Sequence, residues 1–444
     1  MRTAGRARMR LEGRLSDRGA VLAVVLVVAA FAAGSFWWIY GSELADGPPI
    51  RSDGTGYYLY LPAVMLDEDV TMERTVERLF EPHALEAAGL RRVPPHNRYL
   101  DKYPVGEAMM VLPFFLLGDA AARLSDEAAD GFSTPYQVAA AAAGLVFALV
   151  GLAQLGLVLL RWFSRPTVVM TLVTITFGTA LFHYATYDAV FSHAFSFFLV
   201  ATIIRLGLSL YERPRPRSAI ALGLAFGLLV AVRPTNAALV VFISLLGVSS
   251  LRDVVERPKA LLRHAPLLAA GLGAFVVPLL PQLAYWHAIT GKLYVYTYGD
   301  EHLDLLHPHV MDVLFSVRKG LFFWAPLLLF AVIGMPLVRR YVDGMLVPAA
   351  AYLGVSAWVI ASWSTWSYGG GLGQRAFVEA LPVFALGIAA LIETVHGRVA
   401  RSVLVAGLAL ATLLAVHSMV AYWTGSIPVD GTTWDTYVRS FRIG

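Results

Sequence analysis

The chain has 444 residues, of which 57% are hydrophobic and only 15% are charged, with a formal net charge of +4. This composition is typical of a polytopic membrane protein, because each crossing of a bilayer needs roughly 20 mostly apolar residues. The modest positive charge lies in short loops, which argues against nucleic-acid partners, and the absence of cysteine excludes disulfides, thiolate catalysis and cysteine-bound metals.

The first long apolar stretch is Ala20–Tyr40, which follows an arginine-rich start. It is too long for a signal-peptide core, so it predicts a retained first span with the N-terminus in the cytoplasm. Five basic loops follow, and each neighbouring pair encloses enough apolar sequence for two spans, which places all five loops on the cytoplasmic side. These loops are Arg161–Arg165, Tyr211–Arg217, Arg252–Arg263, Arg339–Arg340 and Arg398–Arg401.

The number of apolar stretches between the basic loops predicts an all-α bundle of about eleven transmembrane helices. After Ala20–Tyr40, the expected spans are Tyr136–Leu160, Thr167–Thr186, Ala189–Leu210, Ser218–Val232, Thr235–Leu251, His264–Trp286, Leu321–Val338, Met345–Trp363, Ala376–Ile392 and Val403–Trp423.

Residues 41–135 form one long first external loop in this scheme. Val105–Ala122 is apolar but interrupted by charged residues and proline, and counting it as a crossing would reverse the charge pattern, so we expect it to be interfacial or re-entrant. Leu66–Leu90 is expected to form a charged amphipathic helix along the bilayer surface. Residues 1–444 therefore make one membrane domain without a separate soluble domain, and the short tail Thr424–Gly444 is expected to be an interfacial anchor.

Asp53 is the most informative residue, because it lies in a polar, glycine-punctuated loop just beyond the first span, in the sequence Arg-Ser-Asp-Gly-Thr-Gly-Tyr-Tyr. A carboxylate there is a candidate general base at a membrane surface, and Tyr57 is a candidate substrate contact. Other polar residues at span ends fall on the same external side. Ionisable groups at membrane depth are costly unless they face a wet pocket or one another, which makes a functional site the default hypothesis.

Two external segments add candidate phosphate and sugar contacts. Asp101 and Lys102 directly precede the interfacial segment, where an ammonium group suits a lipid phosphate and the carboxylate can orient it. The turn after residue 182 is dense in proton-transfer and sugar-binding groups, including His183, Tyr187 and Asp188. His193 lies inside an apolar run and also fits a hydrogen-bonded core histidine.

Two further segments offer cations next to helix ends. Arg233 begins an Arg-Pro-Thr-Asn sequence that breaks a long apolar stretch into two short helices, and a guanidinium at such a junction suits a phosphate. The loop 363–375 contains Trp366 and several glycines and ends at Arg375, which together predict a phosphate cradle. Glu379 follows as a further substrate contact. No Gly-Lys-Ser/Thr sequence follows, which excludes a nucleotide-hydrolysing P-loop.

Histidines and carboxylates also gather in one external loop, at Glu301, His302, Asp304, His307 and His309. Such N and O ligands suit a divalent metal, but the spacing matches no zinc motif, and a solvated loop is the alternative. We therefore predict no required cofactor and leave metal dependence open.

These residues resemble the polytopic GT-C fold glycosyltransferases that use polyprenyl-phosphate sugars, such as the protein O-mannosyltransferases and the lipid A aminoarabinose transferases. The resemblance implies that Asp53 is the general base, that Lys102 contacts the donor phosphate, that Asp188 is a second catalytic acidic residue and that Arg233 is the basic residue at the broken helix. The chain departs from the family pattern where Gly54 follows Asp53 and where Tyr103 separates Lys102 from Pro104.

The resemblance implies an inverting transfer of a sugar from a polyprenyl-phosphate donor to an acceptor hydroxyl on a lipid, glycan or protein, outside a bacterial inner membrane, in the biosynthesis of cell-envelope glycans. The main alternative from the residues is a secondary transporter or a lipid or glycolipid flippase, in which broken helices and intramembrane charges form the substrate site. A non-catalytic scaffold is the third possibility.

Overall fold

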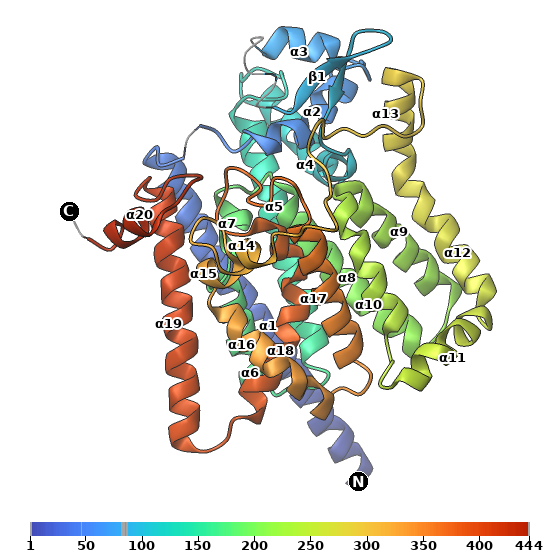
Figure 1. Cartoon of the computed structure of the whole chain (residues 1–444), viewed down its shortest axis with the longest axis vertical. Helices are drawn as coiled ribbons and strands as arrows, with labels where there is room; N and C mark the ends of the chain where they lie inside the picture. Colours follow the sequence, from blue (N-terminus) through green and yellow to red (C-terminus); the bar gives the residue numbers. More distant parts are fainter. Residues whose placement is uncertain (1, 46, 81–84, 86–87, 443–444) are drawn as a thin grey trace.

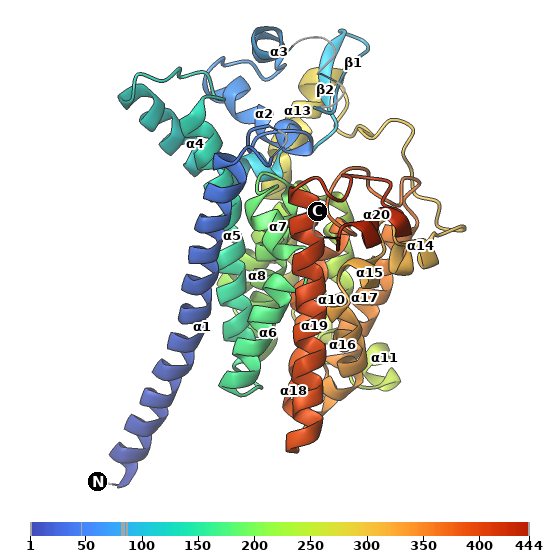
Figure 2. The ribbon, with the colours of Figure 1, turned by 90° about the vertical axis from the view of Figure 1, so that its left-hand side faces the viewer.

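The protein is a helical bundle that carries a smaller layer at one end. The computed structural model describes residues 2–45, 47–80, 85 and 88–442. The end layer, here called the cap, consists of α2 (Asp53–Met65), α3 (Glu73–Leu79), β1 (Leu90–Val93), β2 (Arg98–Asp101) and α4 (Gly106–Leu124). Figure 2 shows the cap at the opposite end of the bundle from the N-terminus.

The bundle is formed by the long first helix and by the helices that follow the cap (Figure 1). Its elements are α1 (Arg2–Gly41), α5 (Thr134–Leu159), α6 (Arg165–Phe177), α7 (Leu181–Thr186), α8 (Ser192–Glu212), α9 (Pro216–Val232), η2 (Pro234–Ala238), α10 (Leu239–Leu245), α11 (Leu251–Leu262), α12 (Ala265–Val276), η3 (Val277–Leu279), α13 (Leu280–Thr290), α14 (Val310–Phe315), α15 (Leu321–Trp324), α16 (Leu327–Gly334), η4 (Met335–Arg340), α17 (Leu346–Ala361), η5 (Arg375–Ala380), α18 (Leu381–Thr394), α19 (Arg398–Trp423) and α20 (Trp434–Arg439).

Six helical segments in the described residues are long and apolar enough to cross a membrane, as in a multi-pass membrane protein. They are Ser16–Gly41, Thr134–Leu159, Ser192–Glu212, Ala265–Thr290, Arg375–Thr394 and Arg398–Trp423. The expected count of about eleven full spans is not confirmed. Several expected spans are shorter or broken helices. Thr167–Thr186 divides at Gly178 between α6 and α7. Leu321–Val338 divides at Pro326, which lacks a backbone N–H, between α15 and α16, and α16 passes directly into η4, which has a proline in its first turn.

The basic loops come together at the end of the bundle opposite the cap. Arg161 pairs with Glu212, and Arg165 donates to Ser16 of α1. Ser164 donates to Glu393 at the end of α18, at an Oγ–Oε2 distance of 2.8 Å. The basic loops therefore lie at one end of the bundle, opposite the cap. The cytoplasmic location of that end stays a prediction.

Among the described residues of the expected amphipathic helix Leu66–Leu90, the prediction is wrong outside α3. Asp69 accepts hydrogen bonds from the backbone N–H groups of Thr71 (2.9 Å) and Arg74 (3.0 Å), a local alternative to helical hydrogen bonding. The helix is limited to α3, and residues 81–84 and 86–87 of the expected range lie outside the described residues. The β1–β2 hairpin that follows was not expected from the sequence, and it pairs Leu90 with Asp101.

The expected interfacial segment Val105–Ala122 is α4, one helix from Gly106 to Leu124. It lies in the cap rather than among the long bundle helices (Figure 2). Its first turn packs on the bundle, since a Cβ added at Gly106 would overlap the backbone of Ala231 and Val232 at the end of α9.

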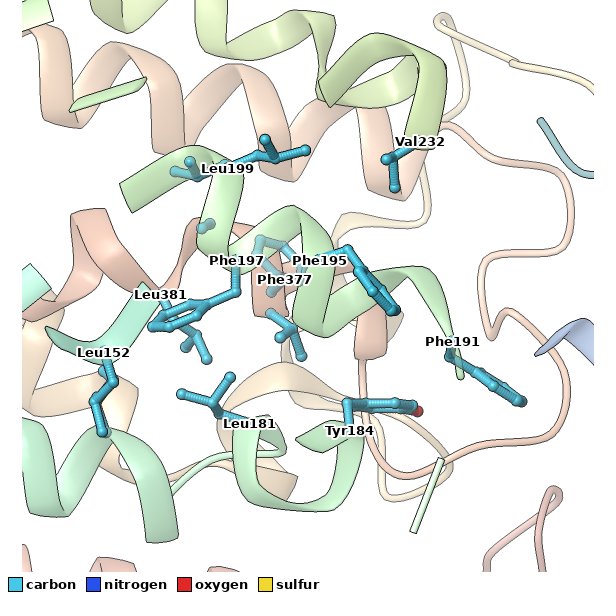
Figure 3. Close-up of a cluster of buried hydrophobic side chains, with 14 of the residues drawn as sticks. Leu152, Leu181, Tyr184, Phe191, Phe195, Phe197, Leu199, Val232, Phe377 and Leu381 are labelled. Carbon is cyan, nitrogen blue, oxygen red and sulfur yellow. The ribbon is translucent and has the colours of Figure 1, made fainter. Parts of the chain in front are cut away.

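A buried cluster joins the bundle helices beneath the cap. Figure 3 shows Tyr184 of α7 and Phe191 next to Phe195 and Phe197 of α8, with Phe377 and Leu381 from the η5–α18 segment. All of these side chains are buried. The cluster fixes the segments whose ends carry the polar groups described below.

Gly144 allows the closest approach of α5 to the loop that contains Asp188. A side chain at Gly144 would collide with the carbonyl oxygen of Ala189, which is backbone and cannot swing away. We expect Gly144→Val to lower the free energy of unfolding by about 1–3 kcal/mol through overpacking. The measurement is the thermal unfolding midpoint of the purified protein in detergent. Gly354→Val in α17, where an added Cβ meets nothing within 4 Å, is the control, and equal effects of both changes would contradict the packing argument.

Candidate active site

Asp53 is the first residue of α2 and is partly buried, with 21% of its side chain exposed. Its Oδ1 accepts a hydrogen bond from the Tyr103 hydroxyl at 2.7 Å, and its Oδ2 lies 2.8 Å from Nη1 of Arg375. The carboxylate therefore joins α2, the segment between β2 and α4, and the start of η5. The sequence placed Asp53, Lys102 and Arg375 on one side of the bundle, and the structure brings Asp53 and Arg375 into direct contact.

The pKa of Asp53 lies below its usual range. Burial opposes ionisation, but it is outweighed by the Arg375 guanidinium, the Tyr103 hydrogen bond and the Lys102 charge, which all lower the pKa of this carboxyl. Asp53 is therefore a carboxylate at neutral pH, which is the state a proton acceptor requires.

Arg375 has donors that the described residues leave without an acceptor. Nη2 donates to the Tyr368 carbonyl at 2.7 Å, whereas Nε and Nη1 are buried without a hydrogen-bond partner. Nη1 is at ion-pair distance from Asp53 but is not aligned as a hydrogen bond. Because unsatisfied buried donors are costly, this guanidinium is prepared for an additional anionic or polar group.

The glycine-rich loop before Arg375 is fixed by hydrogen bonds to Lys319 and Val429. Gly369, Gly371 and Gly373 adopt positive φ angles, which glycine allows without strain. Lys319 is buried and donates to the carbonyl oxygens of Gly371 and Val429, and the Gly371 N–H donates to the Val429 carbonyl at 3.2 Å. The predicted cradle is thus a loop fixed by backbone contacts, with Arg375 as its charged end.

Lys102 lies beside Asp53 and is paired with a carboxylate from another segment. Its Nζ is 2.5 Å from Oε1 of Glu301, whose Oε2 accepts from the Trp363 indole at 2.9 Å. The ammonium group also lies 5.1 Å from the centre of the Tyr298 ring. The segment between α13 and α14 therefore covers the cation that the sequence predicted to hold a phosphate.

Arg233 stands at the junction of α9 and η2, as the broken-helix interpretation expected. Its Nη1 lies 3.5 Å from Oε1 of Glu379, which also meets Nδ1 of His193 at 3.0 Å. The Arg233 guanidinium faces the Tyr368 ring at 5.7 Å, next to the carbonyl that Arg375 contacts. Arg233 and Glu379, both predicted site residues, are therefore one buried ion pair beside the Asp53 cluster.

Asp188 belongs to a separate buried network. Its Oδ1 lies 2.8 Å from the Arg51 guanidinium, and its Oδ2 lies 2.9 Å from Nε2 of His183. The Trp423 indole donates to Nδ1 of His183 at 2.9 Å. An indole N–H only donates, so Nε2 of this histidine carries the proton and donates to Asp188. This network positions the loop whose Val190 backbone packs on Gly54, next to Asp53.

The remaining predicted contacts divide between the site and its surroundings. Tyr57 follows Asp53 by one helical turn and is buried, with its ring 4.6 Å from that of Tyr103. Tyr187 supplies a carbonyl oxygen to Arg51 and stacks on Trp423 in the Asp188 network. Trp366 lies under the Arg318 guanidinium, 5.8 Å away, and its carbonyl accepts from Gln374.

Asp101 points into the cap, where it is fully buried. Its Oδ1 accepts from the backbone N–H of Tyr103 at 2.8 Å, and its Oδ2 has no hydrogen-bond partner in the described part of the chain. Burial raises the pKa of Asp101 well above its usual range, so the group is neutral and braces the turn that presents Tyr103.

Sequence reasoning missed the roles of Tyr103 and Glu107. Tyr103 appeared only as the residue that separates Lys102 from proline, yet its hydroxyl holds Asp53. Glu107 appeared only as an interruption of an apolar run, yet it is a buried carboxyl close to Asp53. The available signal was the same for both residues, a polar group directly beside the Lys102 motif.

The histidine-rich external loop forms local pairs. Asp304 meets His307 at 3.0 Å, and Asp312 meets His309 at 3.4 Å, while Glu301 is engaged by Lys102. Among the described residues, no group of three or more histidine or acidic side chains is arranged to hold a metal ion.

Comparisons of the chain with protein-family models, with curated proteins and with solved structures gave no match. The conclusions about function therefore depend on the geometry of the site and on the resemblance in its motifs.

Glu107 makes the stability of the fold depend on pH. Its pKa is raised well above the ordinary value by burial and by the Asp53 charge, so the folded state keeps a proton that the unfolded state releases. The contribution of Glu107 to stability is therefore fully present below the unfolded pKa of 4.5 and is lost as pH rises through the folded pKa. We expect Glu107→Gln to remove up to about 1.4 kcal/mol per pH unit of this slope.

The measurement is the unfolding midpoint of wild type and Glu107→Gln between pH 5 and pH 9. Glu127→Gln, an exposed residue beyond the end of α4, is the control and should follow the wild type. Parallel curves for wild type and Glu107→Gln would show that Glu107 is not protonated in the folded protein.

Proposed function

We propose that the protein is a membrane glycosyltransferase that moves a sugar from a polyprenyl-phosphate donor to an acceptor hydroxyl at the cap end of the bundle. One observation carries the proposal. The ionised Asp53 carboxylate lies 2.8 Å from Nη1 of Arg375, whose buried Nε has no hydrogen-bond partner among the described residues. A proton acceptor and a prepared oxyanion site thus lie side by side, which is the pair of functions that such a transfer needs.

In the proposed reaction, Asp53 removes the proton from the acceptor hydroxyl while its oxygen attacks the anomeric carbon. The bond between that carbon and the donor phosphate breaks, and the phosphate leaves with the electron pair, so the configuration is inverted. A phosphate is a good leaving group and needs no strong general acid. A positioned general base contributes about 10²–10⁴-fold to the rate.

The charge balance of the site fits an exchange of anions. Arg375, Arg233 and Lys102 each face a carboxylate, of Asp53, Glu379 and Glu301 respectively. A lipid phosphate that enters this cluster supplies the acceptors that Arg375 lacks and competes for the partly exposed Lys102. The Tyr103 and Tyr298 rings lie 5.9 Å and 5.1 Å from the Lys102 ammonium group, and Tyr57 packs on Tyr103. Such rings suit a sugar, which stacks on aromatic faces and hydrogen-bonds to hydroxyls.

The location of the site at one end of a bundle of membrane-crossing length supports a donor whose prenyl chain stays in the bilayer while its phosphate reaches the interface. With the arginine-rich start in the cytoplasm, the site faces outward from a bacterial inner membrane. The acceptor is a lipid, a glycan or a protein of the cell envelope.

The distribution of charge favours a transferase over a transporter or flippase. Transporter sites lie near the middle of the membrane, between broken helices. Here the charged groups are at the start of α2, at the end of α9 and at the start of η5, next to the cap. In the described part of the chain, the buried carboxylates with cationic partners belong to this layer.

Asp53→Asn should abolish transfer, because the amide keeps the shape and the contact with Tyr103 but cannot accept the proton. We expect a loss of at least about 10²-fold in turnover with normal expression. The measurement is mass spectrometry of lipid-linked sugars and envelope glycans from cells that carry wild type or the variant at matched expression. An accumulated prenyl-phosphate sugar together with a missing glycan residue is the expected pattern.

Asp126→Asn is the matched control, because Asp126 is exposed and has a positive φ angle that asparagine tolerates. Wild-type glycan profiles in cells with only the Asp53→Asn protein would rule out Asp53 as the base.

Arg375→Ala should act on both donor binding and proton transfer. Loss of hydrogen bonds from a charged donor predicts a rise of about 10–100-fold in the apparent donor KM. The Arg375 charge also lowers the pKa of Asp53, so its removal should shift the acidic limb of the kcat/KM profile to higher pH.

The measurement is the pH dependence of transfer by purified protein over a range of donor concentrations. Arg123→Ala on the exposed side of α4 is the control. An unchanged donor KM would contradict the phosphate role of Arg375, and an unchanged acidic limb would contradict its coupling to Asp53.

A further inference from the structure

Glu107 is a carboxyl group that the reaction above does not use. It lies in the first turn of α4 with 1% of its surface exposed, and neither of its side-chain oxygens has a hydrogen-bond partner in the described part of the chain. Asp53, Asp188 and Glu379 each meet a cation or a histidine, and Asp101 accepts a hydrogen bond from the Tyr103 N–H. Glu107 differs from these four because both of its side-chain oxygens lack a partner in the described part of the chain.

The surroundings place Glu107 at the edge of the Asp53 cluster. Its neighbour Gly106 is pressed on the backbone of Ala231 and Val232, which directly precede Arg233. The charge of Asp53 acts on Glu107, and α4 packs on α2, the helix that carries Asp53 and Tyr57. The carboxyl therefore lies between α2, which begins with Asp53, and the end of α9, which is followed by Arg233.

An unpartnered buried carboxyl is costly, and native proteins retain such groups where a ligand satisfies them. Burial and the neighbouring charge of Asp53 keep this group neutral. A neutral carboxyl offers one O–H donor and a carbonyl acceptor, which matches a hydroxyl group that both accepts and donates. An ammonium group would instead require the ionised form at a position where burial opposes it.

We propose that Glu107 binds a hydroxyl group of the sugar held next to Asp53, and that it selects a neutral, hydroxylated sugar over an amino sugar at this position. This inference rests on the proposed function, because it assigns the sugar end of the donor to Glu107 and Tyr57 and the phosphate end to Arg375. Specificity arises because a sugar without that hydroxyl leaves the buried carboxyl unpaired.

The test separates the two ends of the donor. Full-length protein in lipid nanodiscs is titrated with farnesyl phosphate, with farnesyl phosphate that carries a hexose, and with the same lipid that carries a 2-amino-2-deoxyhexose. The proteins are wild type, Glu107→Gln, Glu107→Leu, Arg375→Ala and the control Glu127→Gln. Thermal unfolding of each variant shows that it is folded before binding is compared.

Wild type should bind the hexose lipid more tightly than farnesyl phosphate, and Glu107→Leu should lose about tenfold in affinity for the hexose lipid while keeping its affinity for farnesyl phosphate. Glu107→Gln also presents a neutral donor and acceptor, so it should stay within about threefold of wild type. Arg375→Ala should weaken both lipids. Equal weakening of both lipids by Glu107→Leu, or no effect of it on either, overturns the inference.

A different pattern would reverse the assigned chemistry. If wild type prefers the amino sugar and Glu107→Gln loses as much as Glu107→Leu, the carboxyl is ionised and pairs with an ammonium group, which overturns the inference while leaving the transferase proposal intact.

If wild type binds none of the prenyl phosphates, the proposed function fails, and methyl glucoside, methyl mannoside and methyl galactoside then decide the inference alone. Saturable binding by wild type that Glu107→Leu loses and Glu107→Gln keeps supports sugar recognition by Glu107. The same binding in wild type and Glu107→Leu, or none in wild type, overturns it.

Discussion

The ion pair between Asp53 and Arg375 connects the cap to the bundle. Asp53 begins α2, and Arg375 begins the segment that continues into α18, more than three hundred residues later in the sequence. Neither charge is tolerable at this depth alone, since desolvation of an unpaired ion costs several kcal/mol. The cap therefore has one favoured position on the bundle, in which Tyr103 also reaches Asp53. The same contact that fixes the two layers also forms the chemical centre of the site.

The pairing of opposite charges extends around this centre. Arg233 with Glu379, Lys102 with Glu301, and Arg51 with Asp188 bring together residues that are far apart in the chain. Such a layer is nearly neutral as a whole, which lets it be buried, yet each cation keeps its charge for an entering anion. The apolar cluster beneath it, with Phe195 and Phe377, supports the helices at fixed positions. The donor phosphate of the proposed function would therefore exchange ion-pair partners within a rigid frame.

The sequence predicted the parts of this arrangement that depend on composition and local breaks. Apolar length identified the helical segments, basic loops identified the two ends, and Arg233-Pro234 identified a helix junction. It could not predict partners, because Asp188 meets Arg51 only after α1 and α7 pack together, and this contact gives Asp188 a cationic partner other than Arg375. Hydropathy also could not show that an apolar run such as Leu321–Val338 is several short helices, because the breaks depend on prolines and not on apolar content. For Glu107, the available signal was a charged residue in an apolar helix that begins just after the Lys102 motif.

The contacts of the glycine-rich loop have a consequence for biosynthesis. Val429 accepts from Lys319 and from Gly371, and Asp430 is bound by Arg318 at 2.7 Å, so the segment after α19 supports the loop that presents Arg375. Val429 and Asp430 follow the other residues of the site in the sequence, so they leave the ribosome after them. A nascent chain whose long helices are already inserted still lacks these anchors, and its site gains its final shape only after residues 429 and 430 have been synthesised. Assembly of the membrane bundle and maturation of its chemical centre are therefore separate events in time.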